Sequence, residues 1–257
     1  MTAGPNFRRA YFESRYGQLH CANAFPSTGG FDERTPLICV HDAPGSATDL
    51  RGLQADLGRD RSVYAPDIPG CGMSDAPAHA VALSEYAAAI LDVIAGLRLR
   101  QYALVGVGVG AALVAEMALA RREPVQKLVL IAPRLNPPDQ SALSADAGGA
   151  YLAALWRQAG SEAGGLDPEA IGRRVGERLR AGAPGYWPAA TLRTWRARER
   201  LAELASPTLC LAESAALERV KGLMPRARIA LLAGESAPAQ LAAPAAMLAE
   251  LRRFLDG

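Results

Sequence analysis

Short apolar runs recur along the chain, and each is followed closely by a turn signal. They cover residues 37–40, 63–65, 102–105, 127–131, 208–211 and 229–232. Such runs are typical of buried parallel strands. Segments with helical periodicity cover residues 47–57, 85–97, 111–121 and 241–254. Because parallel neighbours need crossover helices, this alternation predicts an α/β protein with a doubly wound, mostly parallel sheet. We expect Ser84 to cap the second helix.

Two regions depart from the alternation. Residues 8–14 and 19–25 are separated by Tyr16-Gly17 and predict an antiparallel hairpin at the sheet edge. Residues 136–204 hold all three tryptophans in helical stretches that Gly and Pro interrupt. They predict a small helical lid, inserted after the sixth strand of a core made of residues 1–135 and 205–257.

The lid suggests where a ligand would bind. Ligands of doubly wound sheets lie in the crevice outside the carboxyl ends of the strands, where this insertion would emerge. We therefore expect a small-molecule ligand in a pocket under the lid. The alternative is a purely structural insertion whose aromatic residues only pack.

Composition narrows the functional class. The 257 residues are 50% apolar, which is enough for one core, and the net charge of +2 gives no reason to expect nucleic acid or an anionic membrane as partner. The absence of a signal peptide or membrane span predicts a cytoplasmic location. The four cysteines are widely spaced, so we expect buried free thiols, no disulfide and no metal site, and no cofactor. The abundance of Ala, Arg and Gly is typical of a GC-rich bacterial genome.

Two loops carry a family resemblance. Residues 41–46 read His-Asp-Ala-Pro-Gly-Ser directly after an expected strand, and residues 67–75 read Asp-Ile-Pro-Gly-Cys-Gly-Met-Ser-Asp. The first is similar to the oxyanion loop His-Gly-x-Pro-Gly-Ser of α/β-hydrolases, and the second resembles the loop that follows the next strand of that family. With the strand, Gly-rich turn and helix that come next, the resemblance implies the α/β-hydrolase fold over nearly the whole chain.

The resemblance breaks at the catalytic positions. Where the family has its Gly-x-Ser-x-Gly elbow, residues 106–110 read Gly-Val-Gly-Val-Gly, so Gly108 takes the place of the nucleophile. Aligned in the same way, Ala215 takes the place of the acid and Ala237 that of the base. No histidine follows His79. The resemblance thus implies a degenerate Ser-Asp-His triad, which excludes a serine hydrolase of the family mechanism.

Two alternatives bear on this interpretation. Some relatives carry the acid after the preceding strand, where Asn136 and Asp139 are available. The Gly-rich turn also resembles a dinucleotide-binding loop, but its register does not match and no acidic residue ends the next strand at Leu130-Ile131.

The backbone N–H donors of the family's oxyanion site are expected to be present even though the triad side chains are missing. The N–H groups of Ala43 and Val109 match the family's oxyanion donors, so Asp42, Ala43, Gly108 and Val109 are the expected ligand-binding residues. These groups would bind or polarise a carbonyl.

Other side chains are candidate catalysts. His41 resembles a histidine that is buried and bonded to the loop backbone, which favours a structural role. Glu213 and Glu235 fall near the lost acid and base and would serve as a carboxylate base if buried. Cys71 fits a small loop residue better than a reactive thiol.

These observations predict a triad-less pseudoenzyme, not a hydrolase, that binds a small carbonyl-containing molecule or acts as a non-catalytic partner. The alternative is an atypical enzyme, a lyase, cyclase, isomerase or cofactor-free oxygenase, that uses the oxyanion site without a serine. A third hypothesis is a subunit that forms a homo-oligomer or pairs with an active homologue.

Overall fold

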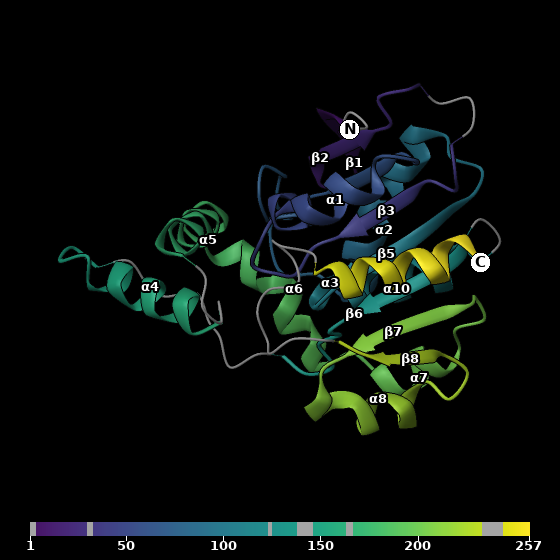
Figure 1. The fold of residues 1–257 in the computed structure, drawn as a ribbon. Helices are drawn as coiled ribbons and strands as arrows, with labels where there is room; N and C mark the ends of the chain where they lie inside the picture. Colours follow the sequence, from purple (N-terminus) through teal and green to yellow (C-terminus); the bar gives the residue numbers. More distant parts are fainter. Residues whose placement is uncertain (1–3, 30–32, 123–124, 138–145, 163–166, 233–243) are drawn as a thin grey trace.

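The computed structural model describes residues 4–29, 33–122, 125–137, 146–162, 167–232 and 244–257. Within them the chain forms an eight-stranded sheet in the order β1-β2-β4-β3-β5-β6-β7-β8 (Figure 1). The strands are β1 (Asn6–Ser14), β2 (Gly17–Phe25), β3 (Leu37–Val40), β4 (Val63–Pro66), β5 (Tyr102–Val107), β6 (Val125–Ile131), β7 (Thr208–Ala212) and β8 (Arg228–Leu231). Strand β2 pairs antiparallel with β1 and with β4, and the remaining pairs are parallel. The expected doubly wound, mostly parallel sheet with an edge hairpin is confirmed.

Helices cover both faces of the sheet. The core helices are α1 (Arg51–Leu57), α2 (Leu83–Leu97), α3 (Val109–Ala120), α8 (Leu217–Leu223) and α10 (Ala245–Asp256), with the short 3-10 turns η1 (Ala47–Leu50) and η4 (Ser214–Ala216). The apolar residues of α1 and α10 share one buried cluster with the sheet, whereas those of α2 and α3 belong to the cluster on the opposite face. Figure 1 shows α1 and α10 in front of the sheet.

Helix termini differ from the sequence expectation in several places. Helix α2 begins at Leu83 with Ala82 as its N-cap, so Ser84 lies inside the helix and the expected cap was wrong. The segment 47–57 forms the 3-10 turn η1 before α1, since Ser46 caps η1 through its side chain. The last helix is described from Ala245, and residues 241–243 lie outside the described ranges.

The insertion between β6 and β7 is helical. It consists of α4 (Ala150–Glu162), α5 (Pro168–Ala181), η2 (Ala183–Tyr186), α6 (Trp187–Ala190), η3 (Thr191–Arg193) and α7 (Ala197–Ala202). Figure 1 shows α4 and α5 to one side of the sheet. In the η2 turn, the Gly185 carbonyl lies 3.7 Å from Cys71 Sγ, so this part of the insertion rests on the loop after β4.

No described helix is both long and apolar enough to cross a bilayer.

Candidate active site

The turn between β5 and α3 is the centre of the site. Gly108 has φ +59° and ψ −116°, a backbone conformation that a residue with a side chain adopts only at a cost. A Cβ placed on Gly108 would lie 2.2 Å from Asp42 Cγ and 2.2 Å from its Oδ1. The space over the elbow, where a nucleophilic side chain would start, is therefore filled by the carboxylate of Asp42.

That carboxylate has an ordered set of donors. Its Oδ1 accepts hydrogen bonds from the Val109 N–H at 2.7 Å and from the Ala43 N–H at 3.0 Å. Its Oδ2 accepts from Arg134 Nε at 2.9 Å, and only 12% of the Asp42 side chain is exposed. Val109 is the first residue of α3, so the partial positive charge of the helix N-terminus also favours an anion here. Both expected oxyanion donors thus converge on one oxygen of this chain's own carboxylate.

Arg134 is a site residue that sequence reasoning missed. It lies in the loop after β6, and its N–H donates to the Gly108 carbonyl at 3.1 Å. Strands β3, β5 and β6 are neighbours in the sheet, so their carboxyl ends bring Asp42, Gly108 and Arg134 together from separate parts of the chain. Its position just after a parallel strand was the signal that could have found it.

His41 is held by the backbone. It is fully buried, and its Nε2 accepts the Ile68 N–H at 3.0 Å. The proton must then be on Nδ1, which donates to the Asp42 carbonyl at 2.8 Å. Because both ring nitrogens are engaged, His41 orients the Asp42 backbone and has no free lone pair for general base catalysis.

The other sequence candidates are not brought to the elbow. Glu213 and Ala215 are exposed, at the N-cap and inside the turn η4, and no described hydrogen bond joins Glu213 to Asp42 or Gly108. Asn136 accepts a hydrogen bond from Arg219 Nη2 at 2.9 Å. The remaining candidates lie outside the described residues: Glu235, Ala237 and Asp139.

Cys71 is buried in the loop after β4, and burial raises the pKa of its thiol above its ordinary value, which favours the unreactive protonated form. Among the residues that the structure describes, no group of three or more His, Cys, Asp or Glu side chains could hold a metal ion.

Comparison with known proteins identifies the family and the fold. The sequence model of the alpha/beta hydrolase fold family matches residues 35–163. A proline iminopeptidase from Heyndrickxia coagulans is 32% identical over 114 residues, which are 42% of this chain and 39% of that protein. The chain therefore aligns with well under two thirds of that relative's length.

Solved structures resemble nearly the whole chain. An esterase from a Rhodococcus species has a TM-score of 0.76 at 20% identity and covers 100% of this chain and 99% of its own. The epoxide hydrolase CorEH has a TM-score of 0.73 at 14% identity, with 98% and 99% covered. At these identities the likeness establishes the fold.

The expectation of a non-hydrolytic pseudoenzyme with a degenerate triad was wrong, because the relatives and structural neighbours are an iminopeptidase, esterases and an epoxide hydrolase. The inference failed because it counted only the side chains at the family's serine, acid and base positions. It treated Asp42 as a ligand-binding residue and did not foresee that its carboxylate lies against Gly108. The matched family sequence, which spans half of the chain, and the fold together place this protein in the alpha/beta hydrolase fold family.

Proposed function

We propose that the chain is a hydrolase that opens epoxides, with the carboxylate of Asp42 as its nucleophile. The observation that carries this proposal is the position of that carboxylate over Gly108, at the turn where the family places its nucleophile. An epoxide is a strained cyclic ether, and its ring carbons accept a nucleophile such as a carboxylate.

The two oxygens of Asp42 have different surroundings, and this difference suits covalent catalysis. Oδ1 is fixed by the N–H groups of Val109 and Ala43, which leaves Oδ2 as the attacking atom. Attack by Oδ2 forms an ester bond to a ring carbon while the ring C–O bond breaks. The electron pair of that bond stays on the ring oxygen, which takes a proton from water.

The leaving groups favour an epoxide over an ester as substrate. Attack of a carboxylate on an ester carbonyl gives a tetrahedral intermediate that can expel either the carboxylate or an alkoxide. A carboxylate is the conjugate base of an acid with a pKa of about 4 and leaves far more readily, so the intermediate returns to the starting ester. Attack on an epoxide carbon has no such competition.

The same donors serve the second half of the reaction. The hydroxide left when the opened ring oxygen took its proton from water attacks Asp42 Cγ in the ester intermediate, and negative charge develops on Oδ1. The proton of that hydroxyl passes to the product oxygen when the intermediate collapses. The Val109 N–H at 2.7 Å and the Ala43 N–H at 3.0 Å already point at this oxygen, so they stabilise the charge without rearrangement. Collapse of the intermediate breaks the bond from Cγ to the product oxygen and restores the carboxylate. The net reaction adds one water to the epoxide and releases a diol.

Arg134 supplies a cation at the reacting oxygen. Its Nε lies 2.9 Å from Oδ2, the atom that attacks. Once Oδ2 carries the substrate, this N–H is positioned to stabilise the charge on the opened ring oxygen. The shared fold of the epoxide hydrolase CorEH supports the substrate class, and the iminopeptidase and esterase support hydrolysis in general.

The test is a single turnover of styrene oxide by excess enzyme in heavy-oxygen water. We expect the first diol to carry no label and the Asp42 peptide to become labelled, because the oxygen delivered to the substrate comes from the carboxylate. Direct labelling of the diol would refute the nucleophilic role. Asp42→Asn should lower the rate by more than about 10³-fold. The control Asp92→Asn removes a half-buried carboxylate that pairs with Arg15 and should leave the rate unchanged.

A cytoplasmic location and a partnership with a second copy or with an active homologue stay predictions. Light scattering of the purified protein tests for a homo-oligomer, and co-purification tests for pairing with an active homologue.

A further inference from the structure

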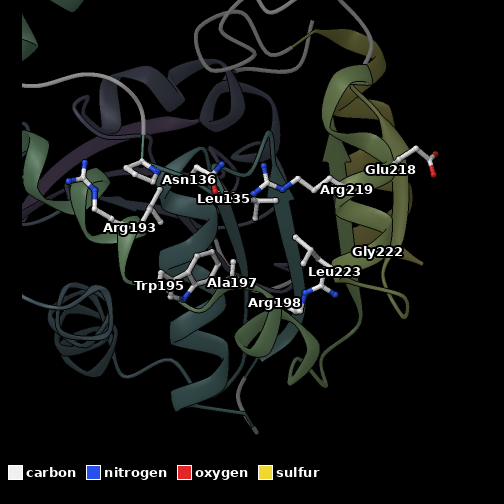
Figure 2. Close-up of a pocket in the computed structure, with 12 residues that line it drawn as sticks. Leu135, Asn136, Arg193, Trp195, Ala197, Arg198, Glu218, Arg219, Gly222 and Leu223 are labelled. Carbon is white, nitrogen blue, oxygen red and sulfur yellow. Dashed lines mark hydrogen bonds between the residues drawn. The ribbon is translucent and has the colours of Figure 1, made fainter.

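A polar hollow lies beside the loop that carries Arg134. A cavity of about 590 Å³ opens between the end of the insertion and α8, and the loop after β6 forms one of its walls. Its lining includes Arg193 at the end of η3, Arg198 in α7 and Arg219 in α8. Figure 2 shows these arginines coming from different elements around the hollow. Guanidinium groups gathered from three elements make a cationic rim.

The positive charge of this rim is not balanced by the acids around it. Glu218 is the one acidic residue among the described lining residues, and its carboxylate accepts from Lys221 Nζ at 2.7 Å. Figure 2 shows Glu218 pointing away from the hollow. No described acidic side chain forms an ion pair with Arg193, Arg198 or Arg219. Each guanidinium therefore keeps donors for an anion that enters from solvent.

The acids in α7 and at its C-cap already pair with other arginines. Arg196 pairs with Glu199 at 2.9 Å, and Arg200 pairs with Glu203 at 3.1 Å. These acids are therefore already paired and do not neutralise the three arginines of the rim.

The floor of the cavity is apolar. Leu135, Leu192 and Leu223 line it and are 9%, 2% and 8% exposed. Above this floor, Arg219 is oriented by its hydrogen bond to the Asn136 side-chain oxygen at 2.9 Å. An apolar floor under a cationic rim fits an organic anion with a hydrocarbon part. The ligand's hydrocarbon chain would pack on the leucines, and its anionic group would bind the arginines.

The loop after β6 connects the proposed active site to the cavity. Arg134 contacts Asp42, and the next three residues, 135–137, form a wall of the cavity. At about 3.3–3.6 Å for each extended residue, the far end of this wall lies within about 11 Å of Arg134. One substrate molecule of moderate length can reach both places.

We infer that this cavity binds a carboxylate of the substrate, so that the substrate class is an epoxide whose hydrocarbon chain ends in a carboxylate. The epoxide part rests on the proposed function, whereas the carboxylate part rests on the arginines and the leucine floor alone. A planar carboxylate can take paired N–H bonds from one guanidinium, and the floor directly beneath accommodates its acyl chain.

Binding without chemistry tests the carboxylate part. Octanoate has no epoxide ring, so its affinity, measured by calorimetry, is independent of any reaction at Asp42. We expect octanoate to bind at least tenfold more tightly than octanamide, and we expect this preference to weaken with added salt. Arg219→Gln should remove most of the preference while leaving octanamide binding within about twofold. Equal binding of the acid and the amide, or a preference that survives Arg219→Gln, would overturn the inference.

A control variant and a competing anion test whether the binding is specific to this cavity and to a carboxylate. Arg196→Gln is the matched control, because this neighbouring arginine pairs with Glu199 and is not among the lining residues. It should leave octanoate binding unchanged, and an equal loss in this variant would assign the preference to general surface charge. Inorganic phosphate should compete only weakly. Tight phosphate binding without octanoate binding would show that the cavity prefers a phosphate group to a carboxylate, and it would refute the inference.

Turnover separates this inference from the proposed function. Epoxyhexanoate, epoxyoctanoate and epoxydecanoate with the ring at the far end should be hydrolysed faster than their amides, with an optimum at one chain length. If only neutral epoxides react, and the reaction depends on Asp42, the proposed function is supported and the carboxylate site is refuted. If octanoate binds as expected but no epoxide reacts, the carboxylate site is supported and the proposed function is refuted.

Discussion

Adding one methyl group at the elbow separates the proposed carboxylate mechanism from a vestigial turn. In Gly108→Ala, the new Cβ would lie 2.2 Å from Asp42 Cγ and 2.6 Å from Oδ2, closer than any real contact. Nothing can relieve this clash except movement of the carboxylate or of the turn. The carboxylate would then leave the N–H groups of Val109 and Ala43.

The magnitude follows from two costs. A non-glycine residue at φ +59° costs on the order of 1–3 kcal/mol. Each lost hydrogen bond to the Asp42 carboxylate adds on the order of 1 kcal/mol after the displaced groups are solvated. We expect a loss of about 3–5 kcal/mol in unfolding free energy, which lowers Tm on the order of 6–20 °C for a chain of this size.

The assay compares thermal unfolding with turnover of styrene oxide. Activity should fall more than about 10³-fold at temperatures where the variant is still folded, because the nucleophile has moved. Gly176→Ala is the control, since that glycine lies in α5 with nothing within 4 Å of an added Cβ, and it should be neutral or slightly stabilising. A Gly108→Ala variant that keeps wild-type stability and activity would refute the placement of the carboxylate. Gly108→Ser adds the same Cβ and should likewise not create a serine hydrolase.

Three further outcomes are expected. Val109→Pro removes one donor at the first position of α3, where proline is tolerated, and should lower epoxide turnover about 10–100-fold; unchanged turnover in the folded variant would show that the donor is unused. Burial by itself raises the pKa of Asp67, but the hydrogen bond with His20 and the other contacts outweigh it and leave this pKa below its ordinary value. The stabilising effect of ionised Asp67 should be complete above about pH 4 and lost as the pH falls through the lower native pKa, so the advantage in urea midpoint over Asp67→Asn should shrink in acid. Glu116→Gln breaks the buried ion pair with Arg200 and should cost about 1–3 kcal/mol in urea unfolding, without moving the steady-state preference for carboxylate substrates.

The sequence by itself determined the sheet and the identity of the elbow. Apolar runs such as residues 127–131 can only be buried strands in this context, and the two loop motifs fix which strands carry the site. The N–H donors of Ala43 and Val109 were also predictable, because backbone groups follow from the turn and not from side-chain packing. The cap at Ser84 was not, since the local preference of serine was overridden by a helix that starts at Leu83, two residues before the expected start.

Only the tertiary structure decided what occupies the elbow. In the chain, Asp42 and Gly108 are far apart, and their contact exists because β3 and β5 are neighbours in the sheet. The sequence shows an aspartate in a loop motif but not the direction of its carboxylate. That direction is set by the donors at the start of α3 and by Arg134, which arrives from the end of β6. The sequence shows directly that Gly108 replaces the family's serine. The placement of the Asp42 carboxylate against Gly108 depends on how β3, β5 and β6 pack side by side.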